Sequence, residues 1–134
     1  FERTASVAEI ILVARSERVA EFEELVRQHA FKKIRCVIPG GEQRHDSVRA
    51  GLASLSKDTT FVAVHDAARP LVTPEQIQRV FELARLHGGA ALAEPITNTV
   101  KRADKNCVVT GAVARENLFA MQTPQIFSRE LIGR

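Results

Sequence analysis

The sequence predicts an α/β domain with a mainly parallel sheet, helices on both faces and a projecting β-hairpin arm. Four short apolar runs, at residues 9–15, 34–38, 61–65 and 90–96, have the composition of strands buried on both faces. A segment with helical spacing of its apolar residues follows each of the first three runs. This alternation of strand and helix is typical of a parallel sheet.

The predicted helices differ in how clearly the sequence marks their ends. The first follows Ser16, and the second spans residues 44–55. The third has the strongest start signal, with Thr73 at the N-cap, proline at the first helical position and glutamine at the capping-box position. It is predicted to end at Gly88 or Gly89, because a glycine readily takes the left-handed conformation that ends a helix.

After the fourth strand the pattern changes to two extended segments, residues 97–104 and 107–115, joined by a predicted turn at Lys105 and Asn106. We therefore expect a β-hairpin arm over residues 96–115 within a single domain of residues 1–134. The hairpin has few apolar residues, so we expect it to need a partner surface. A further helix is expected to begin at Ser128.

Composition narrows the classes of function. The 134 residues carry a net charge of +3 and contain neither tryptophan nor tyrosine, which argues against a nucleic-acid-binding surface. No apolar run is long enough to span a membrane. Cys36 and Cys107 lie far apart among β-branched residues. They predict buried free thiols in a reducing compartment rather than a zinc site, and the expected location is the cytoplasm.

Ligands of open α/β sheets bind beyond the carboxyl ends of the strands, and three loops with polar residues are predicted there. In the first, two glycines let the backbone approach a ligand, the helix start behind them suits an anion, and Ser47 could add a hydroxyl group, although an ordinary turn has the same pattern. In the second, Asp66 can bind Mg²⁺ or a hydroxyl group and Arg69 can hold a phosphate; an Asp66–Arg69 ion pair that closes the loop is the alternative. His65 is expected to pack or hydrogen-bond nearby.

The third group of polar residues belongs to the hairpin and the segment after it. Basic and hydroxyl side chains there suit a phosphorylated substrate: Thr99, Lys101, Arg102, Arg115 and Thr123. Lys101 and Arg102 are more simply explained as charged residues on a solvent-exposed face of the hairpin, without a role in binding. Arg115 and Thr123 are the stronger candidates, because both lie where the chain is predicted to return to the sheet.

Four motifs together resemble one enzyme family. The segments GGEQRHDSVRAGL, VHDAARPLV, PITNTVKR and RENLFAMQTPQIF occur in the order and spacing of 2-C-methyl-D-erythritol 4-phosphate cytidylyltransferases of the non-mevalonate isoprenoid pathway. The resemblance runs from about Glu9 to the C-terminal end. It implies a Rossmann-like nucleotidyltransferase fold and a homodimer in which the β-hairpin arms embrace. It also implies a reaction in which CTP and the polyol phosphate give the CDP-alcohol and pyrophosphate with Mg²⁺ as cofactor.

The resemblance also implies roles for residues of the matching motifs. Asp66 would contact Mg²⁺ and both substrates, and Arg115 would orient the attacking phosphate as the catalytic residue, reaching in from the partner's arm. The remaining positions divide between the two substrates. The nucleotide would be bound by Gly41, Glu42, Ser47 and Ala67, and the methylerythritol phosphate by Arg69, Thr99 and Thr123, with Thr99 also supplied by the partner.

Parts of the family's pattern lie outside these 134 residues. The resemblance implies a strand and a glycine-rich loop with basic residues before residue 1, and a further catalytic lysine after residue 134. Asn98 stands where the family usually has aspartate. The chain is therefore expected to be part of a longer enzyme, or to be inactive by itself. Two alternatives stay open: a ribitol-5-phosphate cytidylyltransferase, and a non-catalytic nucleotide-binding or dimerisation module.

Overall fold

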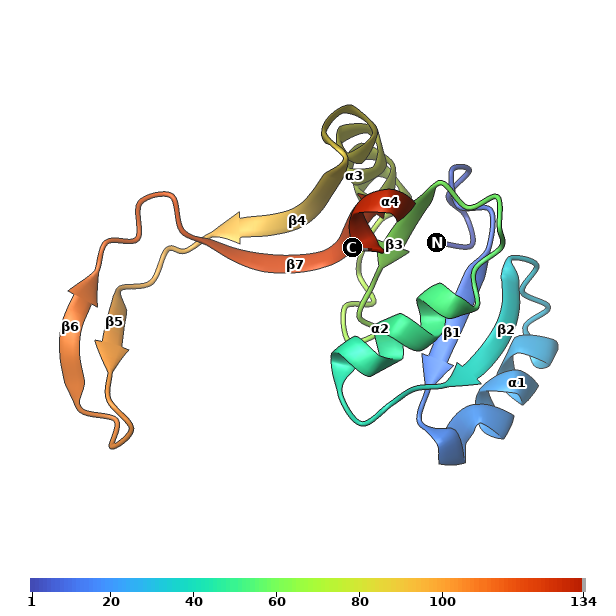
Figure 1. Ribbon diagram of the computed structural model, residues 1–134, viewed down its shortest axis with the longest axis horizontal. Helices are drawn as coiled ribbons and strands as arrows, with labels where there is room; N and C mark the ends of the chain where they lie inside the picture. The colour runs from blue at the N-terminus through green and yellow to red at the C-terminus, as the bar shows by residue number, and fades with distance from the viewer. Residues whose placement is uncertain (134) are drawn as a thin grey trace.

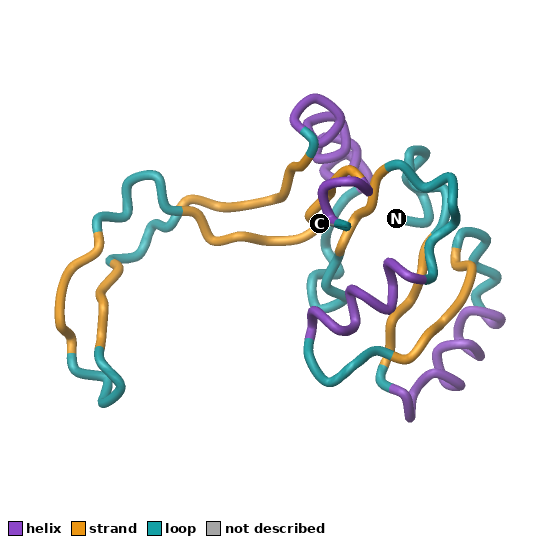
Figure 2. Tube along the Cα trace, viewed as in Figure 1, coloured by secondary structure: helices purple, strands orange, loops and turns teal. Residues whose placement is uncertain are grey.

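The computed structural model describes residues 1–133 and confirms the α/β class (Figure 1). The body is formed by two small sheets with their helices, and a long ribbon extends from it to the hairpin arm (Figure 2). The elements in chain order are β1 (Ile10–Ala14), η1 (Ser16–Arg18), α1 (Val19–Gln28), β2 (Ile34–Pro39), α2 (Arg44–Ala53), β3 (Phe61–Val64), α3 (Pro74–His87), β4 (Gly89–Pro95), β5 (Val100–Ala103), β6 (Val109–Val113), β7 (Phe119–Ser128) and α4 (Arg129–Ile132).

The sheet is less parallel than predicted. β1 and β2 pair in parallel, but β7 lies between β3 and β4 and is antiparallel to both. The sequence does not mark β7 as a strand, because Pro124 interrupts it and glutamines stand between its apolar residues. Tertiary pairing overrides that weak local signal: β7 has a partner on each edge, and Thr123 and Pro124 are buried.

The best-packed core lies where α3 covers the three-stranded sheet. Val80 and Ala84 of α3 pack with Ile126 of β7, and all three are at most 3% exposed. Phe61 of β3 meets Phe81 of α3 edge to face, with ring centroids 5.6 Å apart. In the other sheet, α1 packs on β2 and α2 packs on β1 and β2. The core thus fixes β3 and β7, the two strands that carry the site.

Both ends of α3 form as its sequence predicts. The backbone N–H of Gln76 donates to the Thr73 hydroxyl (3.3 Å), and the Thr73 N–H donates to the Gln76 side chain (3.0 Å). Gly88 ends the helix with a φ of 82°. Ser128 also caps α4 as predicted, accepting a hydrogen bond from the N–H of Leu131 (3.3 Å). The local sequence alone therefore predicted these helix ends correctly.

The arm forms as an antiparallel β5–β6 hairpin, which continues the ribbon of β4 and β7 away from the body (Figure 1). The carboxylate of Asp104 accepts hydrogen bonds from the N–H groups of Asn106 and Val108 and closes the turn. The prediction of two buried thiols is wrong here. Cys107 is exposed in the turn with a φ of 63°, and Cys36 is half-buried, because the β-branched neighbours of Cys107 belong to a hairpin that faces solvent.

Candidate functional site

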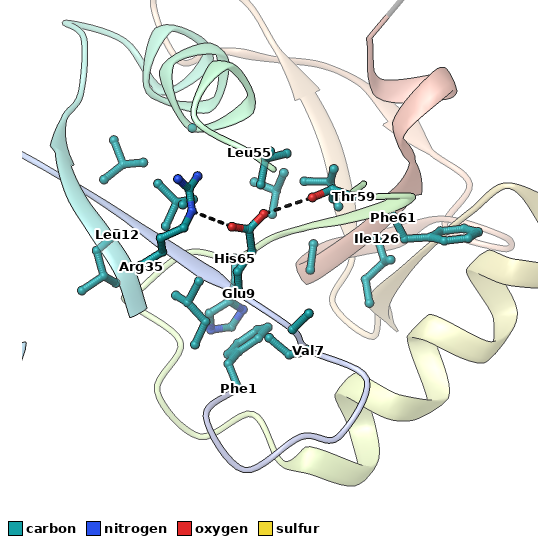
Figure 3. A pocket seen from close by; sticks show the side chains of 18 of the residues that line it. Phe1, Val7, Glu9, Leu12, Arg35, Leu55, Thr59, Phe61, His65 and Ile126 are labelled. Carbon is teal, nitrogen blue, oxygen red and sulfur yellow. Dashed lines mark hydrogen bonds and ion pairs between the residues drawn. The ribbon is translucent and has the colours of Figure 1, made fainter. Parts of the chain in front are cut away.

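A cavity of about 1140 Å³ lies between β1 and β3, two strands that do not pair with each other (Figure 3). Its walls are largely apolar side chains of both strands and of α2. Polar side chains also line the cavity. Arg44 and Ser47 lie at the start of α2, and Asp66 lies just after β3. The structure therefore brings Ser47, Asp66 and Ala67, three of the residues predicted to bind a nucleotide, to one cavity.

Arg44 is the residue that the sequence analysis missed. Its Nε and Nη2 atoms each donate to Oδ1 of Asp66 at 3.1 Å, and both side chains are partly exposed. The structure thus corrects the alternative expectation of an Asp66–Arg69 pair. The signal was present, since Arg44 begins the helix after the glycine loop, at the edge of the sheet where Asp66 was expected. A guanidinium and a carboxylate beside a cavity can together bind a phosphate and a cation.

The two glycines of the first loop have a structural role. A Cβ atom on Gly41 would lie 2.3 Å from the Cβ of Asp46, and one on Gly40 would lie 2.5 Å from Oγ of Ser47. The loop therefore folds tightly onto the first turn of α2, and the close approach is to the helix itself. Gly41 and Glu42 do not belong to the lining of the cavity but lie immediately before the helix that borders it.

A second cavity, of about 360 Å³, lies on the other side of the loop after β3. Arg69 and Thr123, two predicted substrate-binding residues, line it together with Gln76 and Gln122, and Ala68 borders both cavities. The loop of residues 66–69 thus separates the predicted nucleotide residues from two predicted substrate residues. This arrangement suits a transfer between two ligands whose reacting groups meet at the loop.

Thr123 of β7 anchors this loop, and the residue is only 4% exposed. Its hydroxyl oxygen accepts a hydrogen bond from the backbone N–H of Asp66 and lies 3.1 Å from Nδ1 of His65. Nε2 of His65 lies 3.1 Å from the carbonyl oxygen of Arg69. Burial lowers the pKa of the His65 imidazole from its ordinary value. His65 hydrogen-bonds within the loop, as expected from the sequence.

The arm residues lie apart from this group. Thr99 and Arg115 flank the β5–β6 hairpin, which extends away from the body (Figure 1). The Arg115 guanidinium donates to the carbonyl of Thr97. Lys101 and Arg102 are exposed on β5. Within one chain, therefore, the structure does not bring Thr99 or Arg115 to Asp66.

At the amino end of β1, Glu9 organises a separate polar cluster (Figure 3). Its carboxylate accepts hydrogen bonds from Arg35, from the hydroxyl of Thr59 and from both the N–H and the hydroxyl of Ser56. Burial by itself would raise the pKa of Glu9, but these hydrogen bonds outweigh it and lower the pKa to about 2. The cluster ties the segment before β3 to β1 and β2, and both carboxylate oxygens of Glu9 are engaged in doing so.

The donor set at Asp66 fits a shared magnesium site. Over residues 1–133 no cluster of three or more metal-binding side chains occurs, so the protein alone does not form a closed metal cage there. Magnesium commonly binds to one or two carboxylates and completes its coordination with phosphate oxygens and water. Asp66 supplies one such carboxylate, and Arg44 engages only one of its two oxygens.

This α/β body, with polar loops beyond the strand ends and the carboxylate of Asp66 beside a cavity, has the architecture of the nucleotidyltransferases. Comparisons with known proteins identify the family within that class. The family model for 2-C-methyl-D-erythritol 4-phosphate cytidylyltransferase matches residues 1–134, and the chain belongs to that family.

Curated relatives with that name cover nearly the whole chain. The protein from Desulforamulus reducens is 42% identical over 133 residues, which are 98% of this chain and 57% of the relative. The protein from Dehalococcoides mccartyi strain CBDB1 is 36% identical over 134 residues, all of this chain and 59% of the relative. The chain thus spans less than two thirds of the length of these relatives.

Solved structures agree with the sequence comparison. The 4-diphosphocytidyl-2C-methyl-D-erythritol synthase of Anaerococcus prevotii matches with a TM-score of 0.85 and 28% identity, covering 97% of this chain and 56% of that one. The cytidylyltransferase of Francisella tularensis matches with a TM-score of 0.77 and 29% identity, covering 96% and 57%. Separately, none of the helices in the described part of the chain has the length and apolar character needed to cross a membrane.

Proposed function

We propose that the protein containing this chain transfers a cytidylyl group from CTP to 2-C-methyl-D-erythritol 4-phosphate, with release of pyrophosphate, in isoprenoid precursor synthesis. The observation that carries the proposal is the loop of residues 66–69, which presents Asp66 to one cavity and Arg69 to the other. Membership of the family supplies the identity of the substrates. Because the relatives have the methylerythritol name, the comparisons favour this reaction over the ribitol-5-phosphate alternative.

The polar end of the larger cavity, where Arg44, Ser47 and Asp66 lie, is proposed to receive CTP. Ser47 and Ala67 line it directly, and Gly41 and Glu42 precede the helix at its border. The first turn of α2 adds backbone N–H groups and the positive end of the helix dipole, both of which favour a phosphate. Arg44 adds a positive charge beside Asp66 and is proposed to contact the triphosphate.

The smaller cavity is proposed to receive the polyol phosphate, with Arg69 and Thr123 as its contacts. A phosphate oxygen of this substrate would attack the α-phosphorus of CTP, and the bond to the bridging oxygen of the β-phosphate would break as pyrophosphate leaves. Two anions must meet for this step, so positioning and neutralisation of charge provide most of the catalysis. Asp66 would hold Mg²⁺, which supplies neutralisation of the phosphate charges when bound.

Thr99 and Arg115 are proposed to act on a second copy of the chain. They lie on an exposed arm that is remote from the site of its own body, as Figure 1 shows. Exposed apolar residues of the arm and its ribbon, among them Val108, Val109, Phe119 and Met121, favour a partner surface. A homodimer with exchanged arms would place Arg115 of one copy beside Asp66 of the other. The proposed location of the enzyme is the cytoplasm.

The experiment that tests the proposed function compares two acceptors. The protein expressed from its complete gene is incubated with CTP and Mg²⁺ and either 2-C-methyl-D-erythritol 4-phosphate or D-ribitol 5-phosphate, and pyrophosphate release is measured. We expect kcat/KM to be at least about a hundredfold higher for the methylerythritol substrate, because misplacement of the attacking phosphate is costly. Equal rates, or release with ribitol phosphate alone, would overturn the proposal.

A further inference from the structure

His65 is a polar residue in the centre of the site, and the reaction described above gives it no role. It follows β3 directly and is half-buried, and its ring lies between the loop of residues 66–69 and Thr123 of β7. Both ring nitrogens are engaged, at 3.1 Å from Oγ1 of Thr123 and 3.1 Å from the carbonyl oxygen of Arg69. The imidazole thus bridges the strand that carries one predicted substrate residue and the loop that carries another.

The chemistry of its partners fixes where the proton of this imidazole lies. A carbonyl oxygen can only accept a hydrogen bond, so Nε2 must carry the proton that it donates to Arg69. The Thr123 hydroxyl accepts from the backbone N–H of Asp66, and its own proton can then be donated to Nδ1 of His65. The neutral imidazole with its proton on Nε2 therefore satisfies every group in the chain of hydrogen bonds.

The same chain of hydrogen bonds fixes the shape of the loop. Arg69 donates its backbone N–H to the carbonyl of Asp66 (3.0 Å), which closes a turn. His65 holds the far end of that turn through the Arg69 carbonyl, and Thr123 holds the near end through the Asp66 N–H. The backbone positions of Asp66 and Arg69, which present their side chains to different cavities, are thus set by one imidazole and one hydroxyl.

We propose that His65 is a positioning residue that fixes Asp66 relative to Arg69 through Thr123 and the Arg69 carbonyl. This inference rests on the proposed function for its kinetic consequence, but the hydrogen-bond arrangement stands on geometry alone.

The charged groups near this imidazole shift its pKa in opposite directions. Burial is the largest influence on the pKa of His65 and lowers it. The hydrogen bond with the Arg69 carbonyl and the carboxylate of Asp66 raise this pKa, while the Arg69 guanidinium lowers it. Phe1 also lies against the ring, with centroids 4.6 Å apart (Figure 3). Thr123, the contact from β7, carries no charge.

The test uses the protein expressed from its complete gene and four variants. His65→Gln can keep the donor to the Arg69 carbonyl and loses the acceptor for Thr123, His65→Asn does the reverse, and His65→Phe removes both bonds but keeps an aromatic ring. His87→Gln is the control, because His87 lies exposed at the end of α3. We expect kcat/KM to fall about tenfold in the first two variants and about a hundredfold in His65→Phe, with less than a twofold change in the control.

Two further readouts separate positioning from a purely structural role. In His65→Phe the loss should appear mainly in kcat, with KM for CTP and for the polyol phosphate changed less than about threefold, because the loop positions the reacting groups relative to each other. Nitrogen-15 NMR of the imidazole, which does not depend on activity, should show a neutral ring with its proton on Nε2 at pH 7.

The outcomes separate failure of this inference from failure of the proposed function. A proton on Nδ1 at pH 7, or a folded His65→Phe variant with kcat/KM within twofold of wild type, would overturn the role of His65. If the wild type shows no cytidylyl transfer, the proposed function fails, and NMR still decides the hydrogen-bond arrangement. If His65→Phe does not fold, His65→Gln and His65→Asn decide, since each can keep one of the two bonds.

Discussion

Arg44 and Asp66 are joined by two hydrogen bonds of 3.1 Å, although 22 residues separate them in the chain. Both bonds end on Oδ1 of Asp66, so Arg44 does not engage the second carboxylate oxygen. Arg44 begins α2 and Asp66 lies in the loop after β3, and the two residues meet beside the larger cavity. This pair gives the site a positive and a negative group at the place where a triphosphate and a magnesium ion would have to be accommodated together.

Replacement of Arg44 should reduce activity far more than stability. Both members of the pair are partly exposed, so Arg44→Ala should change the free energy of unfolding by less than about 1 kcal/mol. We expect kcat/KM for CTP to fall at least about tenfold, because a charge beside the triphosphate is lost. Steady-state kinetics and urea unfolding of the same preparation measure the two effects.

The control for Arg44 is Arg79→Ala, which removes another exposed arginine whose guanidinium lies 3.9 Å from the carboxylate of Glu82 on α3. It should leave both the kinetics and the stability nearly unchanged. A loss of stability in Arg44→Ala large enough to explain the loss of activity would show that Arg44 only supports the fold.

The proposed exchange of arms predicts complementation between two inactive variants. Arg115→Ala removes the arm's guanidinium and Asp66→Asn removes the carboxylate of the body, so each homodimer should be inactive. In a mixed dimer one site would carry both changes and the other neither. Random reassembly of equal amounts should therefore restore about a quarter of wild-type activity. No recovery after confirmed subunit exchange would show that Arg115 does not act on the partner's site.

Glu9 should make the free energy of unfolding depend on pH in the acidic range. Its pKa of about 2 in the folded protein lies below the ordinary value of 4.5, so it contributes stability above about pH 4.5 that is lost as pH falls towards 2. Glu9→Gln should cost about 2 kcal/mol at pH 7, where a charged acceptor of four hydrogen bonds is replaced by a neutral one. The difference between the two proteins should shrink as pH falls below 4.5. Urea unfolding at several pH values measures it, and a constant difference would contradict this explanation.

Gly88 and Gly111 form a matched pair for testing the end of α3. A Cβ atom on either residue would meet nothing within 4 Å, but only Gly88 has a positive φ, 82°. Gly88→Ala should therefore lower the free energy of unfolding by about 1 kcal/mol, because an L-residue is strained in that region. Gly111→Ala should lower it by less or raise it. Equal effects of the two substitutions on the urea midpoint would show that the left-handed cap is not the cause.

The sequence predicted the features that depend on local pattern. The caps of α3 and α4 follow from Thr73, Gly88 and Ser128, and the turn of the hairpin follows from the residues around Asp104. β7 escaped prediction, because its identity as a strand comes from having β3 and β4 as neighbours. Pro124 and the flanking polar residues conceal it in the sequence.

The candidate site shows the same division. Asp66, Arg69 and Thr123 were identified before the structure, and the structure places them around one loop. The contact between Arg44 and Asp66 and the two bonds of His65 depend on how three separate segments pack, which no spacing in the sequence reveals. The glycines before α2 were predicted to approach a ligand, whereas their close neighbours are Asp46 and Ser47.

The central claim is that Asp66 is part of a magnesium-dependent cytidylyl transfer site, and pyrophosphate release from CTP and 2-C-methyl-D-erythritol 4-phosphate tests it most directly. The protein expressed from its complete gene should release pyrophosphate only with Mg²⁺, and Asp66→Asn should lower kcat at least about a hundredfold while the folded content stays unchanged. Glu23→Gln, which neutralises an exposed carboxylate on α1 that lines neither cavity, should retain wild-type activity. A folded Asp66→Asn variant with wild-type kcat would contradict the account.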